Sequence, residues 1–119
     1  MGLMIEAACS CGYHASTLLG GGMDNFDREC PTPFHCPSCR AVVTADLLAK
    51  TPACPDCGHR GIVPYTDPAL AGEPGTREVA ECNYFSEDGG GRVSLSDGTY
   101  LCPSCEKATL HFSKVGCYD

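Results

Sequence analysis

The residues of this chain with the clearest chemistry are eight cysteines arranged in four close pairs. The pairs are Cys9-Ser-Cys11, Cys36-Pro-Ser-Cys39, Cys54-Pro-Asp-Cys57 and Cys102-Pro-Ser-Cys105. A tight turn between two cysteines brings both sulfurs to one side of a loop, and two such pairs complete a tetrahedral four-cysteine zinc site. The spacing therefore predicts two structural Zn²⁺ ions.

The second and third pairs make the more secure of the two predicted sites. Fourteen residues separate Cys39 from Cys54, which is a spacing typical of four-cysteine zinc patterns. We expect site 1 to consist of Cys36, Cys39, Cys54 and Cys57 and site 2 of Cys9, Cys11, Cys102 and Cys105. Two other groupings stay open: the first pair with the second and the third with the fourth, or the first with the third and the second with the fourth.

The first pair departs from the pattern, because a single residue separates Cys9 from Cys11. Both sulfurs reach one metal only if the chain turns sharply at Ser10. Zinc accepts nitrogen as well as sulfur ligands, so another residue could replace one of the two. The candidate substitutes are His14, Cys30 and His35. Cys9 and Cys11 remain the expected ligands.

Short strands around the pairs would position these cysteines. Apolar and β-branched runs predict strands over residues 3–8, 13–19, 41–44, 62–65 and 109–112. The fold class that we expect is a small, β-rich, metal-stabilised double zinc ribbon with short antiparallel strands and little helix.

The remaining segments are assigned from turn signals. Ser96-Asp97-Gly98 predicts a hairpin between residues 92–95 and 99–102. Residues 23–34 are predicted to be a polar loop, since they include two prolines, and residues 46–50 are predicted to form one helical turn. Residues 78–85 fit a strand or a helix equally well.

The predicted organisation is a single compact double-zinc unit over residues 1–119. Its inner ribbon would span about 34–66, and its outer ribbon would join 3–22 to 92–113. Residues 67–77, rich in Pro, Gly and Ala, are the expected loop or linker.

Composition shows why cross-links are needed. Leu, Ile, Val and Phe make up less than a fifth of the 119 residues, there is no Trp, and Gly (14) and Pro (9) are abundant. A chain with so few large apolar side chains would ordinarily stay disordered, because burial could not offset the entropy lost on ordering. Eleven cysteines remove this difficulty if metal or disulfides link them.

Metal is the better explanation of the cysteines than disulfides. The cysteine count is odd, and the first residues lack the basic and apolar regions of a signal peptide. No run approaches the roughly 18 apolar residues of a membrane helix. We therefore expect a reduced, cytoplasmic protein that has no contact with membranes.

The cysteine-bearing segments, about half of the chain, also resemble a known structural family. Residues 36–57 look like a zinc ribbon, and Cys102-Pro-Ser-Cys105 with Thr109-Leu-His-Phe112 resembles the closing knuckle of another. Cys9-Ser-Cys11-Gly12-Tyr13 is similar to the opening knuckle of small bacterial zinc ribbon proteins. The resemblance implies fold and metal, and it carries no assigned activity.

The sequence favours a binding role over catalysis. A catalytic zinc keeps an open coordination position, and two four-cysteine sites leave none, so no enzyme activity is expected. The net charge of −7 disfavours nucleic acid, which leaves a protein partner as the expected ligand of an interaction module. The alternatives are a nucleic-acid-associated ribbon of the transcription or translation machinery and, less expected, a thiol redox protein. Iron also fits a tetrahedral sulfur site.

Overall fold

The structure, a computed structural model, describes residues 2–20, 30–86 and 89–118. This part of the chain contains eight β-strands and a short 3₁₀-helix. Their bounds are β1 Gly2–Cys9, β2 His14–Leu19, β3 Pro31–Cys36, β4 Ala41–Asp46, β5 Val63–Pro64, η1 Pro68–Leu70, β6 Glu78–Ser86, β7 Gly89–Ser96 and β8 Leu110–Tyr118. The expected small, β-rich fold with little helix is confirmed.

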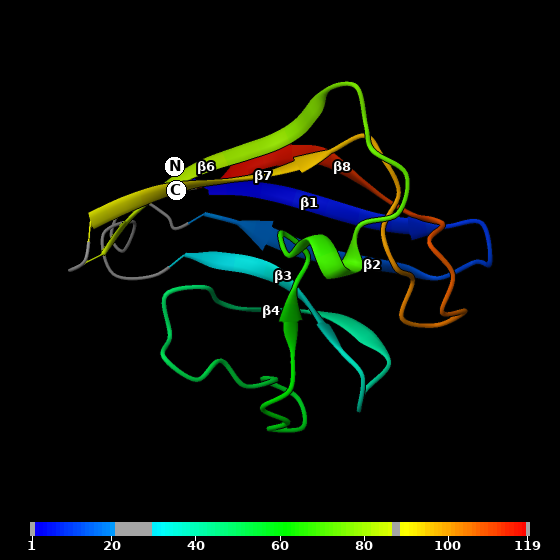
Figure 1. The fold of residues 1–119 in the computed structure, drawn as a ribbon, viewed down its shortest axis with the longest axis horizontal. Helices are drawn as coiled ribbons and strands as arrows, with labels where there is room; N and C mark the ends of the chain where they lie inside the picture. The colour runs from blue at the N-terminus through cyan, green and yellow to red at the C-terminus, as the bar shows by residue number, and fades with distance from the viewer. Residues whose placement is uncertain (1, 21–29, 87–88, 119) are drawn as a thin grey trace.

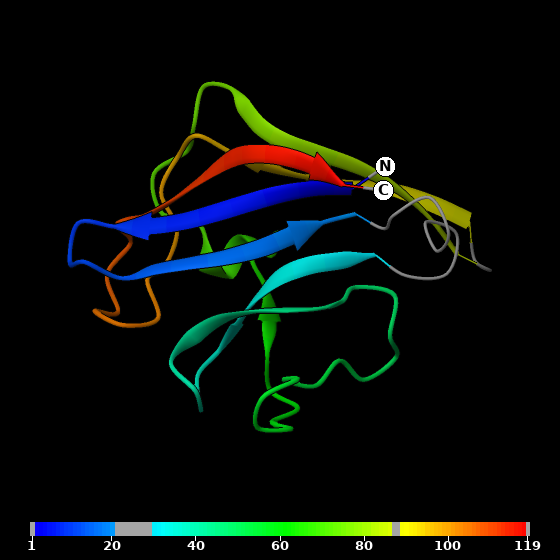
Figure 2. The ribbon, with the colours of Figure 1, turned by 180° about the vertical axis from the view of Figure 1, so that it is seen from behind.

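The strands form three small antiparallel sheets, with strand orders β2-β1-β8, β4-β3-β5 and β6-β7. The β6-β7 hairpin lies along one side of the β2-β1-β8 sheet and β3 with β4 along the other (Figures 1 and 2). β1 pairs with β8 from Gly2 opposite Tyr118 to Cys9 opposite Leu110. The first and last strands of the chain are therefore neighbours, which brings Cys9 close to the turn that precedes β8.

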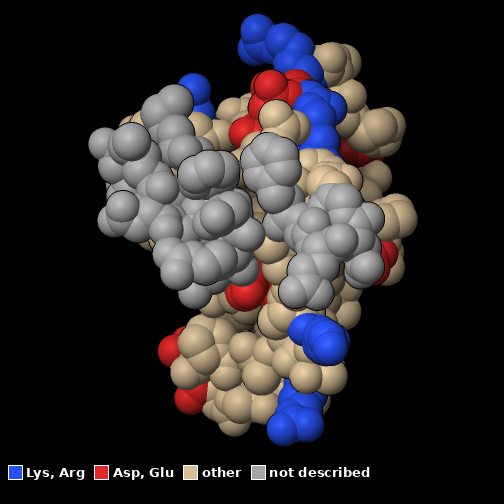
Figure 3. Space-filling view, turned by 90° about the vertical axis from the view of Figure 1, so that its left-hand side faces the viewer, with Lys and Arg blue, Asp and Glu red and all other residues tan. Residues whose placement is uncertain are grey.

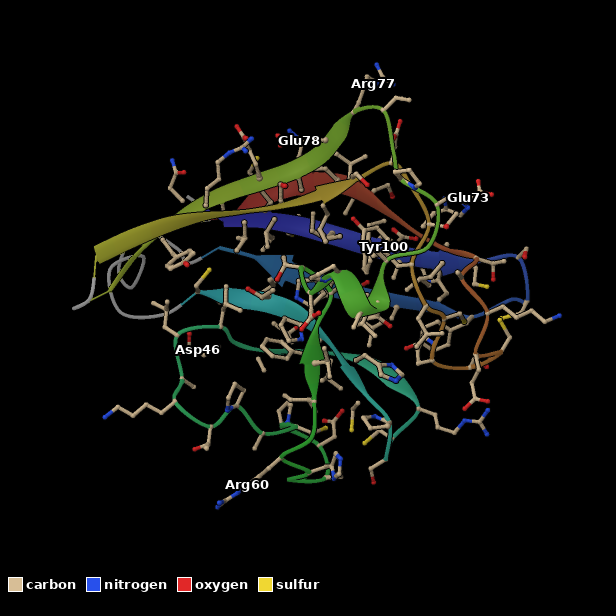
Figure 4. The ribbon with its side chains drawn as sticks, in the orientation of Figure 1. Asp46, Arg60, Glu73, Arg77, Glu78 and Tyr100 are labelled. Carbon is tan, nitrogen blue, oxygen red and sulfur yellow. The ribbon has the colours of Figure 1, made fainter. Side chains whose placement is uncertain are left out.

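The core is small and partly aromatic. The rings of Tyr65, Tyr100 and Phe112 pack edge to face, with centroids 5.0 to 6.1 Å apart. Tyr100 points into the interior (Figure 4), and the hydroxyl of Tyr65 donates to the carbonyl of Leu101 at 2.8 Å. A second cluster of apolar side chains surrounds two cysteines of site 1 and consists of Phe34, Cys36, Val43, Cys54 and Ile62. Sulfur atoms are thus part of the packed interior.

The predicted loop over residues 23–34 is wrong for residues 31–34, which belong to β3; residues 23–29 lie outside the described part. The two prolines fit the strand because both of their carbonyls point away from β4. The carbonyl of Pro31 accepts from Gly20 N–H at 2.8 Å, and that of Pro33 accepts from Tyr65 N–H at 2.9 Å. The missing proline N–H groups lie on that same side, so the ladder with β4 loses no hydrogen bond.

The predicted hairpin around residues 96–98 is also wrong. β7 pairs with β6, and residues 99–102 form no strand. Instead of stabilising a turn between two strands, the Asp97 carboxylate accepts from the backbone N–H groups of Thr76 (2.7 Å) and Arg77 (3.2 Å). Gly98 allows this contact, since a Cβ there would lie 2.3 Å from the carbonyl oxygen of Glu73. The turn therefore holds the segment before β6.

Two further predictions concern residues 46–50 and 78–85. The helical turn at 46–50 is wrong, because the Asp46 carboxylate accepts from Leu48 N–H at 3.0 Å and from Cys30 N–H at 2.9 Å, which fixes a non-helical turn. Residues 78–85 are strand. The segment 67–77 contains η1. Leu70 of η1 is buried, and its backbone carbonyl accepts from the N–H of Leu101 at 2.9 Å.

Candidate metal centres

All four cysteine pairs end in the same backbone conformation. The residue after the second cysteine is left-handed in each pair: Gly12 (φ 100°), Arg40 (54°), Gly58 (77°) and Glu106 (61°). Glycine adopts this conformation freely, whereas other L-residues lose about 1–2 kcal/mol in it. Arg40 and Glu106 are the only non-glycine residues of the described chain with positive φ. The shared geometry of the turns outweighs the local preference of these two side chains.

The turns also share their backbone hydrogen bonds. The N–H of Cys54 donates to the carbonyl of His59, and that of Cys102 to the carbonyl of Lys107, each five residues further on, at 2.9 and 2.8 Å. Cys36 faces Ala41 at the same offset in the β3-β4 ladder. These three turns therefore share one backbone geometry, as their common Cys-x-x-Cys spacing predicts.

The Cys9–Cys11 turn is the same turn shortened by one residue. The N–H of Cys9 donates to the carbonyl of Tyr13, four residues on, and the N–H of Gly12 donates back to the carbonyl of Cys9, both at 3.0 Å. The spacing that departs from the sequence pattern thus still directs both sulfurs to the same side.

The eight sulfurs form two compact groups, and these are the nested groups. Within each group all four sulfurs lie within 4.8 Å of one another. The Sγ atoms are 3.7 Å apart in four pairs, namely Cys36–Cys57, Cys39–Cys54, Cys9–Cys105 and Cys11–Cys102. Four Zn–S bonds of about 2.3 Å meeting at the tetrahedral angle place sulfurs about 3.8 Å apart. Either group could hold a metal ion.

The sulfurs differ in exposure and in the donors around them. Cys36, Cys54 and Cys102 are buried, whereas Cys11 and Cys57 are exposed. Sulfur accepts from backbone N–H groups in site 1, from Cys39 to Cys36 at 3.3 Å and from Asp56 to Cys54 at 3.4 Å. The side of each group that faces the protein is therefore fixed by packing, and at least one cysteine of each group faces solvent.

In site 2 a hydroxyl joins the donors. Thr109 Oγ1 lies 3.0 Å from Cys9 Sγ and 3.7 Å from Cys105 Sγ. Sequence reasoning placed residue 109 in a strand and gave it no role at the metal. The signal that could have found it is its position, four residues after Cys105 and close enough to return to the same turn.

These hydrogen-bond donors lower the pKa of some of the thiols, and burial raises the pKa of others. The backbone N–H of Cys11 and the hydroxyl of Thr109 lower the pKa of Cys9 to about 6, and the backbone N–H of His59 lowers that of Cys57 to about 7. Burial raises the pKa of Cys102 to about 12. The thiols within these groups thus differ in how readily they lose a proton, and a divalent cation would replace the protons that remain.

The proposed substitute ligands lie outside both groups. His14 pairs with Glu6, which lies on the adjacent strand β1. Cys30 is buried, with its sulfur 3.7 Å from Thr32 Oγ1, and the ring of His35 packs edge to face on Tyr65 with centroids 6.2 Å apart. Four cysteines complete each group without them. Cys82 and Cys117 are also free thiols outside the groups.

Acidic and basic side chains are mixed on one face of the molecule (Figure 3). On the face shown in Figure 3, acidic and basic side chains are interspersed in small groups, and Arg60 extends away from the body in Figure 4. Arg92 pairs with both Glu78 and Glu81 across the β6-β7 hairpin. Among the described residues, none of the helical structure is long and apolar enough to cross a membrane.

In comparisons with protein-family models, curated proteins and solved structures, none matches this chain. Its classification is therefore set by its own fold and cysteines. It is a small, β-rich, cysteine-rich protein with two four-cysteine groups that could bind metal ions.

Proposed function

We propose that this protein is a zinc-stabilised interaction module in which both four-cysteine groups hold structural Zn²⁺ and whose ligand is another protein. The observation that carries the proposal is the spacing of the sulfurs. Each group contains four sulfurs, and the Sγ–Sγ distances of 3.7 Å are near the value for a ZnS₄ tetrahedron. The knuckle-like turns and the antiparallel strands that follow them support a double zinc ribbon.

The need for zinc follows from the size of the core. The described chain buries few large apolar side chains, and three of the buried apolar positions are site cysteines: Cys36, Cys54 and Cys102. Zinc binding contributes on the order of 10–16 kcal/mol per site in small zinc peptides at neutral pH. A contribution of this size would replace the missing hydrophobic stabilisation.

A structural role for the metals favours binding over catalysis. Four thiolates fill a tetrahedral zinc, so no position is left for water or substrate. Sulfur in two saturated groups also differs from a redox dithiol, which normally stands alone at the start of a helix. The module would act in a reducing compartment such as the cytoplasm, where its thiols stay available to metal.

A protein partner fits the charge better than nucleic acid does. The chain carries 15 acidic and 8 basic residues, and eight thiolates outweigh two Zn²⁺ ions, so metal loading would make the charge more negative still. Phosphate backbones bind to clustered Lys and Arg, whereas the charges in Figure 3 are interspersed.

Zinc K-edge X-ray absorption on the purified protein tests the metal assignment. We expect four sulfur neighbours per zinc at about 2.3 Å and no lighter ligand. A nitrogen or oxygen neighbour would contradict saturated structural sites, and absence of a zinc edge from the folded protein would contradict the choice of metal.

An electrophoretic mobility shift at low salt tests the choice of partner, with mixed-sequence single-stranded and double-stranded RNA and DNA as probes. We expect no shift at micromolar protein. Tight binding that weakens steeply with salt would overturn the protein-partner proposal in favour of a nucleic-acid role.

A further inference from the structure

The two sulfur groups are connected by contacts between their turns. The loop between β1 and β2, the loop between β3 and β4, and the turn at residues 102–106 lie at the same end of the molecule (Figures 1 and 2). The guanidinium of Arg40, directly after Cys39 of site 1, donates to the carbonyl of Ser104 at 2.8 Å. Ser104 stands between Cys102 and Cys105, so this hydrogen bond joins a turn of site 1 to a turn of site 2.

A second contact joins the sites through a side chain of site 2, whereas the first uses a side chain of site 1. Tyr13, two residues after Cys11 of site 2, accepts at its hydroxyl from the backbone N–H of Val42 at 2.8 Å. Val42 is the second residue of β4, the strand that leaves the Cys36–Cys39 turn of site 1. The carbonyl of Tyr13 also accepts from Cys9 N–H inside its own turn. Tyr13 therefore takes part in the closure of one site and in the start of a strand at the other.

We infer that the two sites bind metal cooperatively, as one coupled unit, through Arg40 and Tyr13; this inference rests on the proposed function. Both residues lie within two positions of a ligand cysteine. Their contacts to the other site form only when both turns are ordered. Metal in one site orders its turns and so lowers the entropic cost of ordering the other, which is a coupling that acts equally in both directions.

The backbone conformation at Arg40 is one that favours glycine. This left-handed conformation, at φ 54°, is unfavourable for an arginine, and the equivalent position after Cys11 and after Cys57 is a glycine. A glycine would close the turn without strain but could not reach Ser104. The side chain that carries the contact between sites thus occupies a position where it is locally disfavoured.

Native mass spectrometry of the full chain tests the coupling while a competing zinc chelator is titrated. In the unsubstituted protein we expect the species with no zinc and with two zincs to dominate, and the one-zinc species to stay scarce. In the double variant Tyr13→Phe/Arg40→Gly, which keeps all eight ligands, the one-zinc species should accumulate. We expect the ratio of the two stepwise affinities to shift by about tenfold, within the usual range for coupled sites.

Glu106→Gly is the matched control. It relieves the same left-handed strain at the equivalent position of another turn, while leaving both contacts between sites in place. It should retain the scarce one-zinc species. If the double variant does not fold with two zincs, Tyr13→Phe alone, which removes one oxygen atom, decides the question.

Equal one-zinc populations in the unsubstituted protein and in the folded variant would overturn the coupling. Accumulation of the one-zinc species to the same extent in Glu106→Gly as in the double variant would also overturn it. Failure of the proposed function itself looks different, because the unsubstituted protein would then bind fewer than two zincs even without chelator.

Discussion

At the scale of the residue, the position after each second cysteine determines how the metal turn closes. Gly12 and Gly58 are left-handed, and a Cβ at either position would meet no other atom within 4 Å. Space is therefore not what favours glycine there; the backbone conformation is. The same position holds Arg40 and Glu106 in the other two turns, which shows that the turn can form at a local cost.

Gly58→Ala isolates this cost. We predict that it lowers the free energy of unfolding of the zinc-loaded protein by about 1–2 kcal/mol, because the added methyl group disfavours the left-handed conformation without a clash. Urea unfolding followed by circular dichroism measures the change. Gly58→Asn should lose less, since asparagine tolerates this conformation. An alanine variant as stable as the unsubstituted protein would show that the turn does not need the positive φ.

Thr109 acts at the same scale through its hydroxyl. The pKa of Cys9 is lowered from 9.0 to about 6, by the backbone N–H of Cys11 and then by Thr109, so its thiolate stabilises the folded state above this window and loses that effect as pH falls through it. Thr109→Val removes the hydroxyl donor and lets protons compete better at Cys9. We predict about tenfold weaker zinc binding at site 2 and zinc release at a higher pH.

Acid titration with a zinc-sensitive dye follows this release. Thr44→Val is the control, because the Thr44 hydroxyl bonds to that of Thr17 at 2.7 Å and not to a site cysteine. Identical release curves for the unsubstituted protein and Thr109→Val would contradict a role for the hydroxyl at the metal.

At the scale of the element, the strands pack on a small core, and their stability depends on a few buried side chains. In β7, Leu95 is fully buried, whereas Ser94 points to the other face. We predict that Leu95→Ala lowers the free energy of unfolding by about 2–5 kcal/mol, the range for large-to-small changes in a core. Ser94→Ala should change it by less than about 0.5 kcal/mol.

Urea unfolding of the zinc-loaded variants compares these values. A loss of less than about 1 kcal/mol for Leu95→Ala would mean that the β6-β7 hairpin contributes little to the packed interior.

The elements also show what the sequence could and could not predict. The metal turns are local: a cysteine pair and the residues beside it contain most of the information, so the four turns follow from spacing. The grouping of the first pair with the fourth is not local, because it depends on the pairing of β1 with β8. β3 forms in spite of its two prolines because Gly20 and Tyr65 donate their backbone N–H groups to the proline carbonyls on the side away from β4. These donors are distant from β3 in the sequence, so no local pattern predicts the strand. The turn at Asp97 likewise serves the segment before β6, which no local pattern indicates.

At the scale of the whole molecule, the two groups differ in how they hold the chain. Site 1 joins Cys36 to Cys57, which are 21 residues apart in the sequence. Site 2 joins Cys9 to Cys105, which are 96 residues apart, beside the paired strands β1 and β8. A cross-link that closes a long loop removes more conformational freedom from the unfolded chain than one that closes a short loop. Metal in site 1 would thus fix the turn between β3 and β4 to residues 54–57, and metal in site 2 would hold the two ends of the chain together.

We propose that two zinc ions in these sites hold the fold together. The most direct test is mass measurement of the same sample under native and denaturing conditions, before and after complete removal of zinc by a chelator. We predict two zincs per chain, a denatured mass equal to that of the fully reduced chain, and a broad, highly charged ion distribution typical of an unfolded chain once zinc is removed. A compact ion distribution that persists without zinc, or a denatured mass lowered by disulfide bonds, would contradict the claim.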